Sequence, residues 1–223
     1  MTIFDWPSVL QPRDILPIWP NETAGLNTSL SGMEQAVPVI RPPWKLRLTF
    51  DNLFGRELLA WRAIMGSLEG RANAVRIPLF DLWFQPGDTA IGGGGVPHSD
   101  GSPFSDQALY LVDDLTGVTV TAAQGDRVIT ADFGAYGEIV EAGLIIGLGE
   151  HPYLITSISW AGSVATIRTN PTMRQDYTAQ NLRVRPSMVA RLTEDDGGQL
   201  EQLLGRYGAP VLNLVERFDG PVL

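Results

Sequence analysis

The clearest pattern along the chain is a strict alternation of apolar and polar residues from position 44 to position 50. A strand places alternate side chains on opposite faces of its sheet. The apolar face comprises Trp44, Leu46, Leu48 and Phe50. The opposite face carries Lys45 and Arg47, so this segment is predicted to be a strand with one buried face.

A helical repeat follows this strand. Between residues 55 and 69, apolar side chains recur at spacings of three and four, which is the period of a helix with one buried face. The predicted buried stripe comprises Leu58, Trp61, Met65 and Leu68. Gly70 stands where a helix C-terminus is capped, and residues 74–84 are predicted to form the next strand. We expect the helix to pack its stripe on the sheet face made by the two flanking strands.

The first 43 residues are rich in proline, which lacks a backbone donor and blocks helix interiors. This arm is therefore expected to be loop or edge strand, with a short strand at residues 33–40. Residues 85–106 form a second segment without a periodic pattern, and it contains the glycine run Gly92–Gly95. A loop of this length inside a compact domain is usually functional or mobile, and this one could become ordered on contact with a neighbouring copy.

Short strands at close spacing replace this pattern between residues 109 and 186. Strands are predicted at residues 118–122, 143–148, 153–158 and 164–168, with turns at Gly125-Asp126, Gly149-Glu150 and Ala161-Gly162. The last two strands are expected to form a hairpin. The whole stretch could close into a small barrel.

The C-terminal part returns to longer elements. A strand at residues 188–192 precedes Thr193–Asp196, a plausible helix capping box, and then come a predicted short helix at 199–207 and a strand at 211–218. The predicted fold is therefore mainly β, a β-sandwich or barrel with two short α-helices. We expect a discontinuous domain of residues 1–108 and 187–223, interrupted by a small β-barrel at residues 109–186.

The composition favours large contacts with other proteins. The 223 residues are 44% hydrophobic and 18% charged, so much of the surface must be neutral or apolar. The net charge of −9 and the lack of a basic cluster argue against a nucleic-acid binder. The same acidic balance would let DNA slide through a conduit without sticking, although ordinary acidic solubility also accounts for it.

The residue inventory excludes several classes of site. The chain has no cysteine, which excludes disulfides and thiolate chemistry, and His98 and His151 are too few for a histidine-rich zinc site. The N-terminus lacks the charged and apolar regions of a signal peptide, and the longest apolar run, residues 143–148, is too short to span a bilayer. A soluble protein made in the cytoplasm is expected.

Several local motifs invite a chemical interpretation, and none meets its requirements. His98-Ser99-Asp100 holds triad residue types, but adjacent residues cannot converge as a catalytic triad does. Gly92–Gly95 lacks the lysine and hydroxyl residue of a phosphate-binding loop. The acidic clusters Asp113-Asp114 and Glu194-Asp195-Asp196 do not match the spacing of a calcium loop. No catalytic, cofactor-binding or metal-binding residue is predicted, and no cofactor.

The six tryptophans divide by their surroundings. Trp44 and Trp61 lie on faces predicted to be core. Trp6 and Trp19 lie in the proline-rich arm and are better candidates for an interface with a neighbour. All six could also line a sugar-binding platform, and a pair of glycosidase carboxylates stays open among the 25 acidic residues.

Several motifs together resemble tail proteins of long-tailed bacteriophages. The arm carries Trp6-Pro7-x-Val9-Leu10-x-Pro12 and Ser29-Leu30-Ser31-Gly32-x-Glu34-Gln35. The middle carries Ala60-Trp61-Arg62-Ala63, Leu68-x-Gly70-Arg71-Ala72 and Gly95-Val96-Pro97-His98-Ser99-Asp100-Gly101-x-Pro103-Phe104-Ser105-Asp106. The later part carries Tyr153-x-Ile155, Val164-x-x-Ile167, Pro171-x-x-Arg174 and Arg185-Pro186. In order and spacing, over roughly residues 6–218, the motifs are similar to those of the distal tail protein family.

The resemblance implies a virion structural protein at or near the tail tip, with no catalytic residues. A distal tail protein caps the tail tube with a ring, expected here to be a hexamer, and receives the baseplate hub. The implied partners are copies of the chain itself, the tail tube protein and baseplate hub or tail tip proteins. DNA would only pass through the lumen, and no membrane contact is expected. The implied location is the virion tail, and the host cytoplasm during assembly.

Other functions stay open beside this one. The chain could be another tail component or a head–tail connector, a module that binds host glycans, or a cell-wall hydrolase carried on the tail. In the favoured interpretation, the arm of residues 1–43 could cross to a neighbour and complete its sheet.

Overall fold

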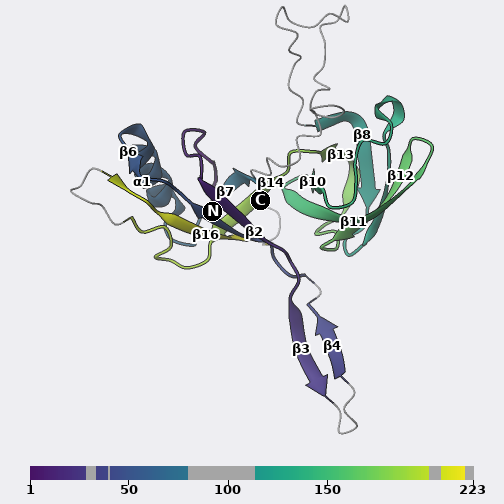
Figure 1. Ribbon diagram of the computed structural model, residues 1–223, viewed down its shortest axis with the longest axis horizontal. Helices are drawn as coiled ribbons and strands as arrows, with labels where there is room; N and C mark the ends of the chain where they lie inside the picture. The colour runs from purple at the N-terminus through teal and green to yellow at the C-terminus, as the bar shows by residue number, and fades with distance from the viewer. Residues whose placement is uncertain (29–33, 40, 80–113, 201–206, 219–223) are drawn as a thin grey trace, which may run out of the picture. The chain divides into compact units, whose positions relative to one another are not determined.

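The computed structural model describes residues 1–28, 34–39, 41–79, 114–200 and 207–218 (Figure 1). Strands dominate these residues, so the predicted mainly β class is confirmed. The chain divides into two compact units. The first is made of Met1–Pro78 and Met188–Leu223, and the second of Leu79–Ser187. The first boundary therefore lies after residue 78, where residue 108 was expected, and the second lies within one residue of the expected place.

A six-stranded sheet forms the frame of the first unit. Its order is β1-β7-β14-β16-β5-β2. The strands are β1 (Ile3–Asp5), β7 (Ala74–Pro78), β14 (Ser187–Leu192), β16 (Val211–Glu216), β5 (Lys45–Thr49) and β2 (Asp14–Ile18). β1 runs parallel to β7, whereas β14 pairs antiparallel with β16, β16 with β5, and β5 with β2. Two C-terminal strands, β14 and β16, thus lie between strands of the N-terminal part in one sheet.

The core of the first unit lies between the sheet and one helix, α1 (Arg56–Leu68). The apolar face predicted for residues 44–50 is buried throughout, which confirms the alternation. On the helix, Leu58, Trp61 and Leu68 are buried as expected, but Ile64 is buried where Met65 was predicted. Phe50 packs edge-on against Trp61, with ring centroids 5.1 Å apart.

One expectation about this helix is wrong. β5 and β7 flank α1 in sequence but are not neighbours in the sheet, because β14 and β16 lie between them. β7 itself ends at Pro78, and the remainder of the predicted strand at residues 74–84 lies outside the described residues apart from Leu79. A helix between two strands in sequence therefore does not cover a two-strand face here.

The second unit is a nearly closed, barrel-like sheet of order β8-β13-β10-β11-β12-β9. Its strands are β8 (Asp114–Ala122), β9 (Val128–Asp132), β10 (Ile145–Leu148), β11 (His151–Ala161), β12 (Val164–Asn170) and β13 (Tyr177–Arg183). A 3₁₀ helix, η1 (Gly134–Tyr136), follows β9. All four predicted strands and the β11–β12 hairpin are present, whereas β9 and β13 were not predicted. One apolar cluster fills the interior.

The predicted second helix is not found among the described residues. Thr193–Gly198 form turns, Gln199 and Leu200 are not helical, and residues 201–206 lie outside the described part. Tyr207 belongs to a strand, β15 (Tyr207–Gly208), which pairs with β6 (Leu53–Phe54). The prediction is therefore wrong at both ends of the 199–207 segment. The final strand, β16, confirms the prediction for residues 211–218 apart from its last two positions.

Candidate functional site

The motifs that invited a chemical interpretation are only partly described. His98, the glycine run 92–95 and Asp113 lie within residues 80–113, outside the described part of the chain. Asp114 opens β8, where it pairs with Arg183 of β13. Among the residues that are described, no group of three or more His, Cys, Asp or Glu side chains is placed to hold a metal ion.

The acidic cluster Glu194–Asp196 forms an exposed turn after β14. Asp195 Oδ1 accepts a hydrogen bond of 3.2 Å from the Arg71 amide, just beyond the end of α1. The Gly197 amide donates to the Glu194 carbonyl at 3.1 Å. These acids therefore tie a turn to the end of α1 and do not begin a helix.

A cavity of about 390 Å³ opens beside this turn, between α1 and residues 192–200. Trp61 forms part of its wall, and its Nε1 donates a hydrogen bond of 3.1 Å to the Gly198 carbonyl. Arg62 and Asp195 are the charged side chains in the lining. No reactive pair of side chains converges on the cavity within the described lining.

The tryptophans are distributed differently from the expectation. Trp44 and Trp61 are core residues, as predicted. Trp6 was expected at an interface, but it is buried, stacks on Phe50 with ring centroids 6.0 Å apart and donates from Nε1 to the Leu10 carbonyl at 2.8 Å. Trp19 remains 42% exposed beside Trp44.

The other two tryptophans stand apart. Trp83 lies outside the described residues. Trp160, in β11, is half-buried and packs edge-on against Phe133 with ring centroids 5.1 Å apart. Of the two interface candidates from the proline-rich arm, only Trp19 is available to a partner.

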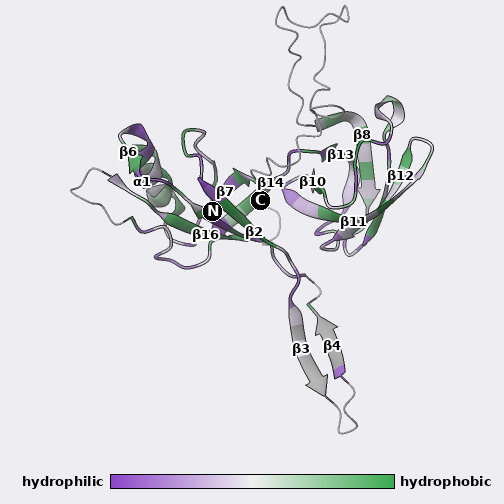
Figure 2. Ribbon diagram, viewed as in Figure 1, coloured by the Kyte–Doolittle hydropathy of each residue, from purple (hydrophilic) through white to green (hydrophobic). Residues whose placement is uncertain are grey.

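Exposed apolar side chains gather on one face of the first unit's sheet. Leu16 and Ile18 of β2 are 53% and 43% exposed, and Val211 of β16 is 36% exposed. Leu16 lies opposite Arg47 of β5, which lies opposite Asn213 of β16, so these side chains share a face. We call this surface the outer strip: Leu16, Ile18, Arg47, Val211 and Asn213. β2 is among the most apolar strands in Figure 2.

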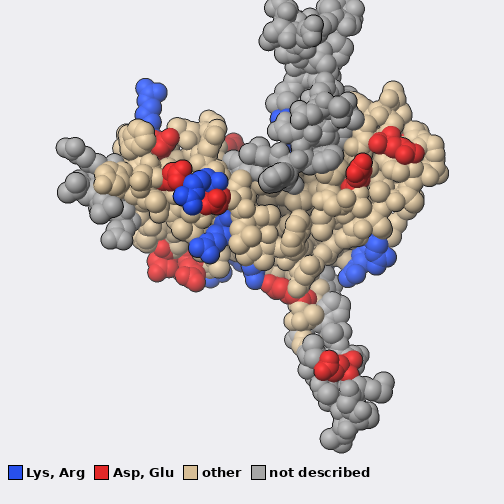
Figure 3. Space-filling model, viewed as in Figure 1, with Lys and Arg blue, Asp and Glu red and all other residues tan. Residues whose placement is uncertain are grey.

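The outer strip combines apolar area with a positive charge. Arg47 is exposed, and no ion pair with another described residue holds it. Lys45, two residues away on the same strand face, forms an ion pair with Glu22 of the proline-rich arm. On a chain of net charge −9, a basic strip flanked by exposed aliphatic side chains is suited to an acidic protein partner. Charged side chains are sparse over much of the described surface in view in Figure 3.

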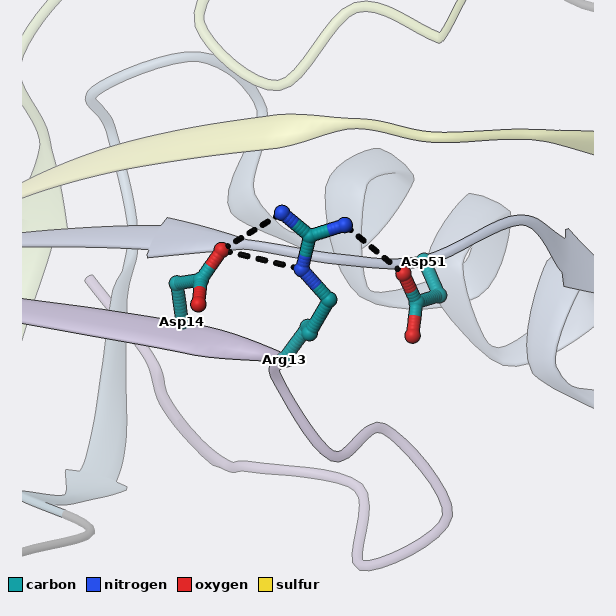
Figure 4. A network of polar contacts seen from close by, with 3 residues as sticks. All are labelled: Arg13, Asp14 and Asp51. Atoms are coloured by element: carbon teal, nitrogen blue, oxygen red, sulfur yellow. Dashed lines mark hydrogen bonds and ion pairs between the residues drawn. The ribbon is translucent and has the colours of Figure 1, made fainter.

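An exposed polar network marks the start of β2 (Figure 4). Arg13 contacts Asp14 Oδ2 through Nη2 at 2.9 Å and through Nε at 3.0 Å, and it reaches Asp51 Oδ1 through Nη1 at 3.2 Å. The bond with Asp14, with a further contribution from Asp51, raises the pKa of Arg13 above its ordinary value. The network joins the start of β2 to the end of β5.

A second exposed carboxylate is held in the barrel unit. The Ser163 hydroxyl and the Gly134 amide both donate to Asp132, and these hydrogen bonds, led by that of Ser163, lower the pKa of Asp132 below its ordinary value. The carboxylate thereby fastens the turn after β9 to the tip of the β11–β12 hairpin. Its acceptor positions serve the turn, which accounts for the shift without a ligand.

A separate two-stranded ribbon completes the picture. β3 (Thr23–Thr28) and β4 (Glu34–Pro38) pair with each other and with no other described strand (Figure 1). The Val39 amide donates to the Glu22 carbonyl at 2.9 Å and closes the base of the ribbon. Glu34 lies at its far end and is exposed. The strand predicted at residues 33–40 is β4.

Comparison with protein families and with curated proteins finds no match to this chain. No helix in the described part is both long and apolar enough to cross a bilayer.

Proposed function

We propose that the chain is a non-enzymatic structural protein of a bacteriophage tail tip, which forms a ring with copies of itself and joins the tail tube to the baseplate hub. The sequence motifs that resemble distal tail proteins are its first support. A ring needs two different patches on each subunit, one for each neighbour. The ring is expected to be hexameric and to let DNA pass through its lumen.

The observation that carries the proposal is the ribbon β3–β4, which belongs to neither six-stranded sheet. An isolated two-stranded hairpin is at best marginally stable in water and usually needs a further strand or a surface to pack on. The outer strip is a second unpartnered feature on the same unit, with Leu16 and Ile18 exposed. A ribbon outside both sheets and an exposed apolar face supply the two different patches that a ring-shaped assembly requires.

Purified full-length protein, examined by mass photometry and negative-stain microscopy, tests the proposal. We expect closed hexameric rings, or a monomer that assembles when isolated tail tubes are added. Immunogold labelling of intact virions should mark the tip of the tail. A compact dimer that never forms a ring, with or without tubes, or a label at the head–tail junction, would contradict it.

A further inference from the structure

The ribbon and the outer strip match each other in length. β3 has 6 residues and therefore extends over about 20 Å. β2, which borders the outer strip, has 5 residues and extends over about 17 Å. A ribbon of this size laid along the strip would cover Leu16 and Ile18 together.

Their charges are complementary as well. Glu34 at the far end of the ribbon is exposed, and Arg47 is the exposed cation of the strip. Within one chain, the same kind of contact already exists at the base of the ribbon, where Glu22 pairs with Lys45 on the same strand face as Arg47. The strand that carries the strip thus already accepts an acidic side chain from the ribbon's base.

We propose that the ribbon of one copy lies on the outer strip of the next copy, with Glu34 placed against Arg47. This contact rests on the proposed ring function and identifies the two patches that such a ring requires. Burial of Leu16 and Ile18 supplies the apolar part of the contact. The ion pair fixes which end of the ribbon lies over Arg47.

The contact uses the face of the sheet rather than its edge. β2 is the outermost strand, and it contains Pro17, which has no amide hydrogen to offer to an added strand. A proline on an edge strand normally turns its missing donor toward the open side. Addition of a neighbour's strand to β2 is therefore disfavoured, whereas side-chain packing on the strip is not.

Cysteine cross-linking tests the contact directly, because the native chain has no cysteine. The double variant Glu34→Cys/Arg47→Cys, treated with a short bismaleimide, should give a ladder of covalent oligomers on a denaturing gel. Both positions are exposed, so folding should be retained. A pairing of Glu34→Cys with Arg168→Cys, an exposed position on the barrel, should give monomer only.

The outcomes separate this contact from the ring itself. Closed rings that yield only monomeric adducts would refute the ribbon–strip contact and leave the ring function standing. A covalent ladder that forms no closed rings, even when isolated tail tubes are added, would retain the contact and refute the ring. Monomeric adducts without rings, with and without added tubes, would refute both.

A charge exchange provides an independent test in the same assay of ring formation. Arg47→Glu and Glu34→Arg should each raise the concentration needed for half-assembly by about fivefold or more, since each places like charges together. The double exchange should return the value to within about threefold of the native protein. Arg168→Glu, which makes the same charge change on the barrel, should have no such effect. Equal loss in the double exchange and the single variants would contradict the pairing.

Discussion

The hydroxyl oxygens of Tyr153 and Tyr177 lie 2.9 Å apart inside the barrel, where both rings are at most 3% exposed. The Arg174 amide donates to the Tyr153 hydroxyl at 2.9 Å, and the Tyr177 hydroxyl donates to the Leu148 carbonyl at 3.1 Å. One consistent direction of donation follows, in which Tyr153 donates to Tyr177. The chain of three bonds joins the loop after β12 to the end of β10 through the interior.

Removing one hydroxyl from this chain should destabilise the barrel. Tyr177→Phe leaves the Leu148 carbonyl and the Tyr153 hydroxyl without this partner, at a cost of about 1–3 kcal/mol. Thermal unfolding of Tyr177→Phe should show a lower Tm than that of the native protein. Tyr207→Phe, which changes a half-exposed tyrosine of the other unit, should leave the Tm almost unchanged. Because both tyrosines serve one chain, Tyr153→Phe/Tyr177→Phe should cost less than the two single changes added together. Strict additivity would mean that the bonds act independently.

Two glycines near α1 should respond to alanine in opposite directions. At Gly198 an added Cβ would lie 2.5 Å from Met65 Sδ, and the backbone φ of +76° already disfavours an alanine. Gly198→Ala should therefore lower the free energy of unfolding by about 1–3 kcal/mol. It should also weaken the hydrogen bond that Trp61 Nε1 donates to the carbonyl of residue 198. Gly66 lies in α1 with nothing near its missing Cβ, so Gly66→Ala should stabilise by about 0.5–1 kcal/mol.

Thermal unfolding and tryptophan fluorescence of both variants provide the measurement. A lower Tm with a changed emission for Gly198→Ala, beside a higher Tm for Gly66→Ala, is the expected pair of results. A Tm of Gly198→Ala equal to or higher than that of the native protein would contradict the close packing of the 193–200 turn on α1.

Local sequence patterns predicted correctly those elements in which the alternation of apolar and polar residues marks the buried face. The alternation from Trp44 to Phe50 has one buried face, so its period is visible in the sequence. β13 was not predicted because its register shifts between Tyr177 and Gln180, which breaks the period-two alternation of buried and exposed residues. Only Tyr177 and Leu182 of that strand are fully buried.

Partners distant in sequence explain the remaining errors. Trp6 looked exposed in its proline-rich context, but Phe50 packs on it from far along the chain. Likewise, no pattern near β5 or β7 indicates that two C-terminal strands lie between them. Of the outer strip, only Arg47 was assigned to a strand face by the sequence pattern, because the pairing of β5 with β2 and β16 is a property of the fold.

The barrel should lose part of its stability in acid through Asp132. Its pKa is lower in the folded state than the ordinary value of about 3.9, so its hydrogen bonds contribute stability above that pH. The contribution is lost as the pH falls through the folded pKa. At about pH 7 the native protein should therefore have a higher Tm than Asp132→Asn. The difference between the two Tm values should shrink below about pH 4.

The donor that lowers this pKa can be removed separately. Ser163→Ala should raise the pKa of Asp132 toward its ordinary value, because the Ser163 hydroxyl is the main cause of the shift. An NMR titration that follows the Asp132 side chain measures this change. An unaltered titration in Ser163→Ala would show that this hydroxyl does not hold the carboxylate.

The buried carboxylate of Glu216 should be essential to the first unit's sheet. Glu216 Oε2 accepts a hydrogen bond of 3.0 Å from the Trp44 amide, and the Glu216 amide donates to the Trp44 carbonyl at 2.8 Å. The two residues thus fasten the end of β16 to the start of β5, the strand that carries Arg47. Glu216→Ala leaves the buried Trp44 amide without this acceptor and should cost about 1.5–3 kcal/mol. Glu216→Gln keeps an oxygen in place, so it should cost less, and chemical denaturation of the two variants measures the difference.

Trp44 also contacts Trp19 with ring centroids 5.4 Å apart. Loosening of β5 in Glu216→Ala should therefore change the tryptophan emission below the unfolding transition, whereas an unchanged emission with native stability would mean that the main-chain pairing alone holds this corner.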